Sequence, residues 1–380
     1  MSTPAPRKGV RILGTRGIPN RHGGFEACAE HLAPWLVERG WDVTVYCQEP
    51  WGQPRRRSTW RGVTLEHLPT RLEGSAGSVA FDLASARHAA AHDDLLLTLG
   101  FNTAVIFPWH RLRRRRHVVN MDGLEWQRGK WPLPVRAWFY ANSWIAGACA
   151  HRLIADHPDI AAMLAARGLA GRTVMVPYGA DRVPDAPAEP LRALQLTPGG
   201  FALVIARAEP ENSVLEIVRA WSMRPRPVPL VVVGHYDALR PYHQAVRAAA
   251  NADVSFVGAV YDTPLVRALR AHTRLYIHGH TVGGTNPSLV EALGAGSPVL
   301  AHDNRFNRWV AGAAGRYFAN TSACATHLDT LLDDAPGLQQ MRAASLARHA
   351  EAFTWEKVLP AYEAVLEAAR ERPARRGGAT

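Results

Sequence analysis

The 380-residue chain has few cysteines and no long apolar run. The four cysteines, Cys28, Cys47, Cys149 and Cys324, have no paired spacing, which argues against a disulfide framework or a zinc site and favours a reducing compartment. No run approaches the roughly 18 apolar residues that a membrane span needs. The opening residues, MSTPAPRKGV, lack the apolar segment of a signal peptide. These absences predict a cytoplasmic protein.

Motifs of other enzyme classes are missing as well. After the first predicted strand the chain reads Gly14-Thr15-Arg16-Gly17 and lacks Gly-x-Gly-x-x-Gly, so a nicotinamide enzyme is a weak alternative. No Asp-x-Asp pair follows a strand, which argues against a metal-dependent transferase. His278 and His280 have no third ligand beside them. The sequence therefore predicts no metal site and no cofactor.

The length and composition predict two globular α/β domains. Hydrophobic residues make up 47% and charged residues 20% of the chain, and 380 residues are many for one core. We expect a first domain over 1–181, a proline-rich linker over 182–199 and a second domain over 200–357. A final helix is expected over 358–371, followed by a disordered tail, 372–380.

Apolar runs predict the strands and helices of both domains. The opening strand, glycine loop, helix and strand form a βαβ unit, the start of a doubly wound parallel sheet. A Trp-rich apolar helix over 133–150 is interpreted as buried core, with an interfacial membrane element as the alternative. The predicted strands are 10–14, 42–47, 63–67, 95–99, 117–120, 152–155, 173–176, 201–206, 230–233, 254–257, 275–277 and 298–301, with further helices at 25–39, 213–222, 242–250, 264–271 and from 322 onward.

The stretch from Leu275 to Asn304 carries the strongest functional signal. A short strand leads into a loop with three glycines, where the backbone can approach a ligand closely, and Pro287 suits the first helical position. The free amides at such a helix start form an anion site. Glu291 lies about one turn further in, where it can accept hydrogen bonds from vicinal hydroxyls. A phosphate and a ribose side by side would satisfy both features.

Three motifs together carry a family resemblance. GGTNPSLVEALGAGSPVLAHDNRFNR, the opening GTRGIPNRHGGFE and MDGLEW resemble retaining glycosyltransferases of family 4, and more narrowly their rhamnosyltransferase-like branch. The similarity extends from about Val10 to Tyr362. It implies the GT-B fold, with two facing Rossmann-like domains, an acceptor-side first domain, a nucleotide-sugar-binding second domain and a last helix crossing back to the first.

The resemblance also implies the site residues. Arg207 takes the position of the phosphate-binding arginine, with a surface ion pair to Glu209 or Glu211 as the alternative. Asp122 and Glu125 are candidates for contacting the transferred sugar or the acceptor hydroxyl, and helix capping is the alternative for Asp122. The catalytic set is thus Arg207, Asp122 and Glu125, and the donor-binding set is Gly23, Gly24, Arg207, Asn212, Gly283, Gly284, Thr285, Asn286, Ser288 and Glu291.

Two positions depart from the broad family pattern. Asn212 stands where a lysine is usual, and Gly283 stands where a first glutamate is usual. Because asparagine carries no charge, we expect the phosphate clamp to depend more on Arg207, on the amides of 284–288 and on Arg16 or Arg21. Loss of the glutamate fits a donor sugar with different hydroxyls, such as a 6-deoxy sugar.

The resulting expectation is a metal-independent retaining transferase that moves L-rhamnose from dTDP-rhamnose to a lipid-linked saccharide. A small-molecule acceptor with another nucleotide sugar, a non-catalytic sugar-nucleotide-binding subunit and an epimerase are the alternatives.

The net charge of +11 concentrates at 55–57 and 111–116. Such runs are usually solvated loops. No nucleic-acid motif accompanies them, whereas an anionic membrane surface fits a lipid-linked acceptor.

Overall fold

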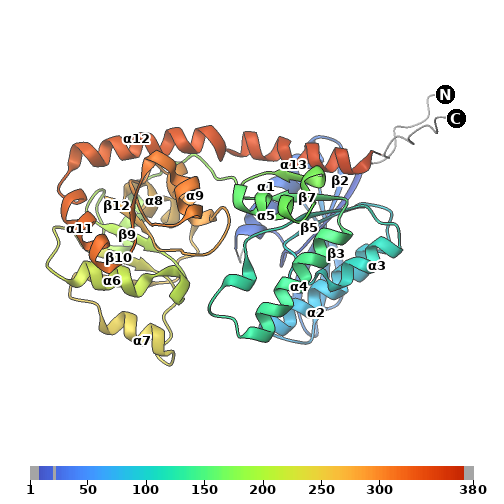
Figure 1. Cartoon of the computed structure of the whole chain (residues 1–380), viewed down its shortest axis with the longest axis horizontal. Coiled ribbons are helices and arrows are strands. Elements are labelled where there is room, and N and C mark those ends of the chain that lie inside the picture. The colour runs from blue at the N-terminus through green and yellow to red at the C-terminus, as the bar shows by residue number, and fades with distance from the viewer. Residues whose placement is uncertain (1–7, 20–22, 372–380) are drawn as a thin grey trace. The chain divides into compact units, whose positions relative to one another are not determined.

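The computed structural model describes residues 8–19 and 23–371, and its contacts divide into two units (Figure 1). Unit 1 takes in the described residues of Met1–Asp122, Pro134–Val176 and Val358–Thr380, and unit 2 comprises Gly123–Leu133 and Pro177–Lys357. Arg21 and the predicted disordered tail, 372–380, lie outside the described residues.

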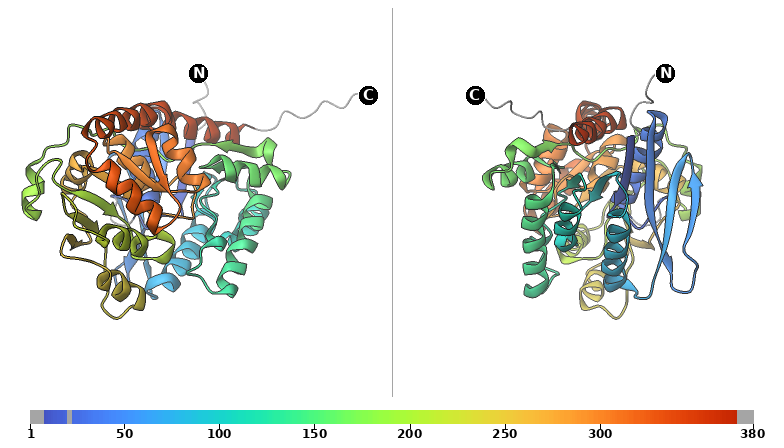
Figure 2. Two further views of the ribbon diagram at one scale, coloured as in Figure 1. Left: turned by 60° about the vertical axis from the view of Figure 1, so that its left-hand side comes forward. Right: turned by 90° about the vertical axis from the view of Figure 1, so that its right-hand side faces the viewer.

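Unit 1 is built on an eight-stranded sheet in the order β3-β4-β2-β1-β5-β6-β7-β8. All neighbours pair in parallel except β3 and β4, which are antiparallel. The blue strands from the start of the chain lie along one edge in the right-hand view of Figure 2. The bounds are β1 Lys8–Leu13, β2 Trp41–Pro50, β3 Arg56–Trp60, β4 Val63–Thr70, β5 Leu95–Leu99, β6 His117–Asn120, β7 Arg152–Ala155 and β8 Thr173–Met175.

Continuous apolar runs explain the central strands of this sheet. All five residues of β5, LLLTL, are buried, because helices cover both faces of a parallel sheet. In register, Val10 of β1 lies opposite Val43 of β2 on one side and Leu95 of β5 on the other. The helices of unit 1 are α1 Gly24–Glu38, α2 Gly74–Ala89, α3 Phe107–Leu112, α4 Leu133–Cys149, α5 Pro158–Ala166 and most of α13 Trp355–Arg370.

The arginines at 55–57 differ from the predicted solvated loop. Arg56 and Arg57 begin the edge strand β3, which pairs with β4. Arg57 forms an ion pair with Glu66, and Arg56 Nη2 lies 2.9 Å from Glu49 Oε1. Because charged side chains protect an exposed edge strand from further pairing, the run has a structural role at the sheet edge.

Unit 2 contains a six-stranded parallel sheet in the order β11-β10-β9-β12-β13-β14. Trp221 and Phe318 are among its fully buried side chains. The strands are β9 Ala202–Ile205, β10 Leu230–Val233, β11 Val254–Gly258, β12 Leu275–His278, β13 Val299–His302 and β14 Gly315–Phe318. The helices are α6 Val214–Ser222, α7 Pro241–Ala248, α8 Thr263–His272, α9 Pro287–Gly294, α10 Arg305–Ala311, α11 Thr321–Leu331 and α12 Ala335–Ala352.

The predicted linker contributes to the core of unit 2. The short 3₁₀ helix η4, Glu189–Leu194, lies within it, and Leu191 is fully buried in the core formed by Phe201, Tyr276 and their neighbours. The polypeptide between the two predicted domains is therefore packed rather than solvated along this stretch.

The last helix returns to unit 1, as predicted. Tyr362 of α13 is buried, and its hydroxyl accepts a hydrogen bond from Asn120 Nδ2 at 2.7 Å. Glu363 receives hydrogen bonds from Arg39 and Trp41, and Glu367 pairs with Lys8 at 2.6 Å. Residues 358–370 thus belong to unit 1 by specific side-chain contacts.

Helix α4 differs from the prediction of a buried core helix. It buries Phe139, Ala146 and Gly147, yet Trp138, Tyr140 and Trp144 are exposed. One face therefore packs in unit 1 while the other presents large aromatic side chains to solvent. Among the described residues, no helix is both long and apolar enough to cross a membrane.

Candidate functional site

Two loops of unit 2 lie at the same edge of its sheet. β9 and β12 are parallel neighbours, so the loop that follows β9 and the glycine loop that follows β12 both begin at their carboxyl ends. The first contains the 3₁₀ helix η5, Pro210–Asn212, and the second leads into α9. In doubly wound sheets, ligands bind at this edge.

Backbone contacts hold the two loops together. Thr281 donates from its amide and from its hydroxyl to the carbonyl oxygen of Glu211, at 2.9 and 3.0 Å. At Gly279 a Cβ atom would lie 2.1 Å from the carbonyl oxygen of Asn212. Only glycine permits this close approach, which sets the start of the glycine loop against η5.

The segment 123–133 completes this group of loops. A Cβ atom on Gly123 would come within 3.3 Å of the backbone of Gly283. Arg128 Nη1 and Lys130 Nζ lie 3.4 and 3.5 Å from the same oxygen of Glu211, Oε1. The MDGLEW motif thus continues into a segment that places two cations beside the glycine loop.

Glu211 is the buried centre of these charges. Its second carboxylate oxygen, Oε2, is buried and accepts no hydrogen bond within the described chain. A buried carboxylate is stable only with cations close by. Arg128 also lies 2.6 Å from Glu125, so Glu211 and Glu125 together fix the position of its guanidinium.

Positive charge is in excess around Glu211. Burial lowers the pKa of Lys130, and the nearby Arg207 guanidinium lowers it further. Burial together with Arg128 and Arg207 lowers the pKa of His280 to about 3, which keeps its imidazole neutral. Arg128 and Lys130 thus pair with Glu211, and the nearby Arg207 adds a third positive charge, so the three cations outnumber the carboxylates of Glu125 and Glu211 and suit an anion.

The predicted residues Arg207 and Asn212 have different surroundings. Arg207 is exposed at the end of β9. Asn212 is buried, and its side-chain amide donates to the carbonyl oxygen of Arg207 at 2.9 Å. Its burial argues against direct contact with the donor, and its hydrogen bond indicates that it supports the backbone of Arg207.

The amides at the start of α9 are only partly available. Pro287 has no N–H, and the amide of Ser288 donates to Asn286 Oδ1 at 3.0 Å. Asn286 therefore caps the helix, so the predicted anion site over 284–288 is reduced to the loop before the helix. In that loop Gly284 and Thr285 are buried, and Gly283 has open space where a side chain would begin.

Glu291 is held in place by an ion pair. Its Oε2 lies 2.5 Å from Arg270 Nη2, and Arg270 also contacts Ser288 Oγ at 3.4 Å. Ser288 Oγ shares a hydrogen bond with the hydroxyl of Tyr276, at 2.7 Å. About a third of the Glu291 side chain is exposed, so the carboxylate is both oriented and accessible.

Asp122 and Glu125 come after β6, as predicted. Asp122 is half-buried, and its amide donates to Asn120 Oδ1 at 2.9 Å. Glu125 begins the 3₁₀ helix η2, Glu125–Gln127, and receives a hydrogen bond from Trp131 at 3.4 Å. Glu125 therefore belongs to the group of loops in unit 2, through Arg128.

Two acids of the neighbouring helices lie near the predicted loop of unit 1. Gly23 and Gly24 open α1, and the buried Glu26 in its first turn accepts from the amide of Arg16 at 2.8 Å. The Arg16 side chain donates to Ser78 of α2 at 2.7 Å. Burial raises the pKa of Asp82, also on α2, to about 6.

Arg128 and Lys130 were not predicted from the sequence as site residues, Glu211 was considered only as a surface ion-pair partner of Arg207, and Asp82 of unit 1 was not predicted. One signal was available for Lys130. The chain has 44 lysines and arginines, but only Lys8, Lys130 and Lys357 are lysine. A lysine at position 130, shortly after the MDGLEW motif of 121–126, is a candidate site residue in such an arginine-rich chain. Nothing comparable marks Glu211, because its contact with Arg128 joins residues 83 positions apart in the sequence.

Comparisons with known proteins agree with this architecture. Residues 201–334 match the family model described as glycosyl transferases group 1, and residues 7–181 match a domain of unknown function, DUF1972. The glycosyl transferases group 1 match lies within unit 2. Its sheet supplies β9, β12 and the two loops that gather at Glu211. A comparison with curated proteins gave no match.

Solved structures resemble the whole chain at low sequence identity. A sucrose-phosphate synthase from Thermosynechococcus elongatus has a TM-score of 0.77 and 16% identity, covering 95% of this chain and 99% of that one. HepE from Anabaena, in complex with UDP and glucose, has a TM-score of 0.75 and 17% identity over 95% and 100%. An α,α-trehalose-phosphate synthase from Burkholderia vietnamiensis has 0.71 and 13% over 95% and 100%. These structures show that the fold is GT-B.

Proposed function

We propose that this protein is a retaining glycosyltransferase that moves L-rhamnose from dTDP-rhamnose to a hydroxyl of a lipid-linked saccharide at the inner face of the membrane. The observation that carries the proposal is the set of three cations around Glu211, beside the glycine loop of a group 1 glycosyltransferase domain.

The cations suit the charge that develops during transfer. As the bond between sugar and diphosphate breaks, negative charge grows on the leaving phosphate, and positioned cations stabilise it without a metal. The planar fork of Arg207 matches two phosphate oxygens, and Lys130 supplies a point charge on a flexible stem. Lys130 thereby takes the role of the lysine that the broad family carries at the position of Asn212.

The space at Gly283 bears on the sugar. The broad family has a carboxylate there that receives hydrogen bonds from sugar hydroxyls. A Cβ at Gly283 would meet no atom within 4 Å, so crowding does not explain the glycine. Absence of the carboxylate fits a sugar with one hydroxyl fewer on that side, such as 6-deoxy rhamnose. Glu291, oriented by Arg270, is assigned to the ribose hydroxyls.

Retention follows if attack and departure occur on the same face of the sugar. The departing diphosphate then accepts the proton from the attacking hydroxyl, and no protein nucleophile is needed. From dTDP-β-L-rhamnose the product is a β-L-rhamnoside. An α-linked product, identified from the coupling constants of the anomeric position, would contradict this mechanism.

A second donor class is favoured by one observation. HepE, which shares the fold, is described in complexes with UDP and with UDP-glucose. A UDP-sugar and a small-molecule acceptor are therefore the alternative, with the same phosphate clamp. A non-catalytic sugar-nucleotide-binding subunit is a further alternative, and the exposed Arg207 beside a partly dehydrated Lys130 argues against it.

A donor panel tests the proposal. The full chain is incubated with dTDP-rhamnose, UDP-glucose and GDP-mannose without acceptor, while the unfolding midpoint and slow donor hydrolysis are measured. We expect dTDP-rhamnose alone to raise the midpoint, because ligand binding stabilises the folded state by mass action. The variant Arg207→Gln should lose that response. A response to UDP-glucose alone would replace rhamnose and retain the transferase, and silence across the panel would favour the non-catalytic alternative.

A further inference from the structure

The exposed side of α4 is apolar along its whole length. Ala137, Trp138, Tyr140, Ala141 and Trp144 all face solvent, together with Ala148 near the end of the helix. A solvent-facing helix surface normally carries charged residues. Polar Asn142 and Ser143 are instead buried, where they bond to Val105 and Arg167 at 2.8 and 3.1 Å. The helix therefore turns its aromatic side outward and its polar residues inward.

A second apolar row runs beside α4. Three hydrogen bonds tie residues 102–111 along it: Trp138 to the carbonyl of Asn102, the amide of Val105 to Asn142, and Arg111 to the carbonyl of Ala148. The successive partners advance along both segments, so the two run side by side. The exposed residues of the two rows, here called the α3–α4 face, are Val105, Trp109, Leu112, Trp138, Tyr140 and Trp144.

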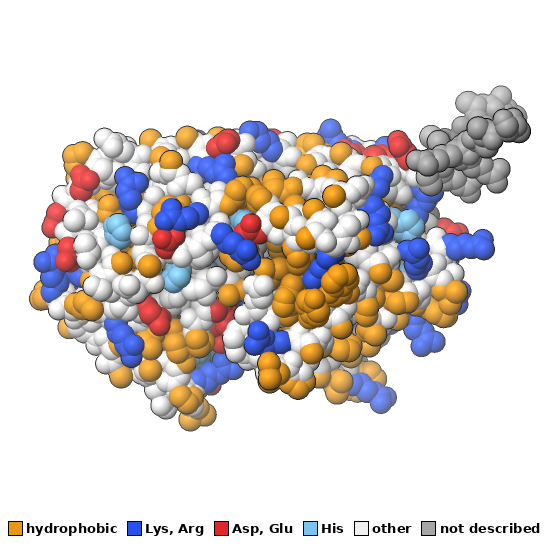
Figure 3. Space-filling view, viewed as in Figure 1, with side chains coloured by type: hydrophobic (Ala, Val, Ile, Leu, Met, Phe, Trp, Pro, Cys, Tyr) orange, Lys and Arg blue, Asp and Glu red, His pale blue; other side chains and the backbone are white. Residues whose placement is uncertain are grey.

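The α3–α4 face is contiguous, which distinguishes it from ordinary exposed apolar residues. Leu112 is 73% exposed, and Trp138 and Trp144 are 42% and 47% exposed. Within residues 177–357 of unit 2 the exposed large apolar residues are Met223, Leu239 and Tyr261, which come from separate segments. Single residues of that kind need no explanation, whereas a contiguous patch marks an interaction surface. Figure 3 shows hydrophobic and basic side chains mixed over this side of unit 1.

Arginines accompany the aromatic residues, and acids are absent. Arg113 lies over the ring of Trp109 at 4.6 Å, and Arg167 over that of Trp144 at 4.3 Å. Residues 95–121 and 126–155, which include all of α3 and all of α4, contain no Asp or Glu. The face thus combines apolar side chains with charge of one sign, the composition of elements that lie in a membrane interface.

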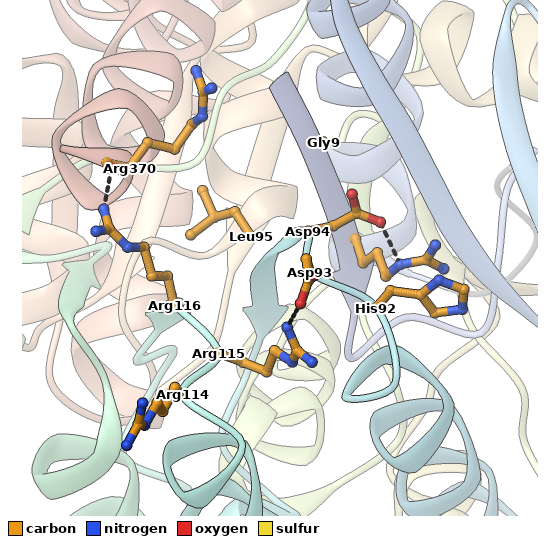
Figure 4. Close-up of a pocket in the computed structure, with 10 residues that line it drawn as sticks. Gly9, His92, Asp93, Asp94, Leu95, Arg114, Arg115, Arg116 and Arg370 are labelled. Carbon is orange, nitrogen blue, oxygen red and sulfur yellow. Dashed lines mark hydrogen bonds and ion pairs between the residues drawn. The ribbon is translucent and has the colours of Figure 1, made fainter. Parts of the chain in front are cut away.

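Not all arginines of the run 111–116 belong to this face. A pocket of about 620 Å³ at the amino ends of β1 and β5 takes in Arg115 and Arg116 (Figure 4). There Arg115 pairs with Asp93, and Arg116 donates to the carbonyl of Ala369 at the end of α13. Those two cations are structural. Arg114 also lines this pocket, but like Arg113 it is exposed, so both cations remain available at the surface.

We propose that the α3–α4 face docks unit 1 on an anionic bilayer surface, with Trp138, Trp144 and Leu112 among the acyl chains and Arg113 and Arg114 at the headgroups. The positive charge of the α3–α4 face favours an anionic bilayer over a second copy of the chain. A symmetric dimer through the same face would bring arginines against arginines, whereas anionic headgroups neutralise them. Docking would bring the enzyme to a lipid-linked acceptor and so deepens the proposed function. Only this link to the acceptor rests on the proposed function; membrane binding itself does not.

Co-sedimentation of the full chain with vesicles tests the docking. The vesicles contain phosphatidylcholine alone or with phosphatidylglycerol, at low and high salt. Wild type should sediment with the anionic vesicles, and the variant Leu112→Gln/Trp138→Gln/Trp144→Gln should partition at least about tenfold less. The matched control, Met223→Gln/Leu239→Gln/Tyr261→Gln, removes three exposed apolar side chains from unit 2 and should bind as wild type does.

A second variant tests the docking with substitutions that are less able to disturb the fold. Arg113→Gln/Arg114→Gln changes only exposed side chains and should weaken binding several-fold, for anionic vesicles alone and mainly at low salt. Unfolding midpoints and the midpoint shift with nucleotide sugar check that each variant is folded. If wild type binds the anionic vesicles but its unfolding midpoint does not shift with any nucleotide sugar, the proposed function fails and the docking proposal stands.

Three results would overturn the docking proposal. Wild type could remain in the supernatant with both kinds of vesicle. The unit 2 control could lose as much binding as the α3–α4 variant. Alternatively, wild type could ignore vesicles and bind a single-stranded oligonucleotide, or self-associate, in a manner that the α3–α4 variant abolishes, which would assign the face to another partner.

Discussion

In unit 2, charged side chains gather inward around Glu211, and the large apolar residues at the surface are scattered. In unit 1 the reverse holds over α3 and α4, where aromatic side chains face outward and Asn142 and Ser143 lie inside. A small ionic ligand needs a few cations held at fixed positions by buried partners. An extended lipid surface needs area and charge but little geometry. These are the two kinds of recognition that the proposed function and the proposed docking require, with a soluble donor in unit 2 and a membrane surface at unit 1.

Among the substitutions in unit 2, removal of Arg207 should lower catalytic activity most. Arg207→Ala removes the exposed cation of the clamp, so we expect kcat/KM to fall by about a thousandfold, as for the loss of one strong electrostatic contact to developing charge. Vesicle binding should be unchanged, since Arg207 lies in the other unit. Steady-state kinetics with the donor found in the panel measure the first quantity, and residual activity above a tenth of wild type would remove Arg207 from the clamp.

Neutralising Glu291 should have a smaller effect. Glu291→Gln weakens hydrogen bonds to the ribose equally in the ground and transition states, so KM should rise about tenfold with kcat nearly unchanged. The variant also breaks the ion pair with Arg270, and its unfolding midpoint must be measured alongside. A fall in kcat with unchanged KM would assign Glu291 to the reacting sugar instead.

In unit 1, Asp82 of α2 should make the stability of the protein depend on pH. Its folded pKa of about 6 lies above the unfolded value near 4, so the folded state binds the proton more tightly. This group therefore makes stability fall as pH rises from about 4 to 6, and contributes no slope above that range. Asp82→Asn retains an acceptor for the Thr103 hydroxyl and should raise stability at pH 7 by about 1 to 2 kcal/mol.

Denaturant titrations at pH 4 and pH 7 measure this effect. In wild type the free energy of unfolding should differ between pH 4 and pH 7, and in Asp82→Asn the contribution of this carboxyl to that difference should be absent. An Asp82→Asn protein with wild-type stability at pH 7 would mean that water reaches the carboxyl and that its pKa is ordinary.

The strands with continuous apolar sequence were predictable, and the polar edge strand was not. LLLTL and LVVV fall on β5 and β10 with their predicted bounds, because parallel strands are buried on both faces. RRSTW of β3 lacks that pattern, since its pairing with β4 leaves it at an edge. GRYF of β14 was also missed, because it is short and begins with glycine.

Hydrophobicity alone misjudged α4. Its apolar residues surround the helix, so the sequence favoured burial on all sides, whereas tertiary contacts bury the side that holds Asn142 and Ser143. The cation set around Glu211 was hidden for a related reason. The position of Lys130 depends on packing of the segment 123–133 against loops of unit 2, and no local pattern in the sequence encodes that contact.

In the proposed function, Lys130 supplies the charge that the position of Asn212 lacks. Calorimetry of dTDP, UDP and GDP binding to wild type, Lys130→Gln and the matched control Lys357→Gln tests it most directly. Lys130→Gln should raise the Kd of the preferred nucleotide by roughly ten- to a hundredfold, and Lys357→Gln should not change it. Adding Asn212→Lys to Lys130→Gln should restore nothing, because residue 212 is buried. An unchanged Kd for Lys130→Gln, or rescue by Asn212→Lys, would contradict the account.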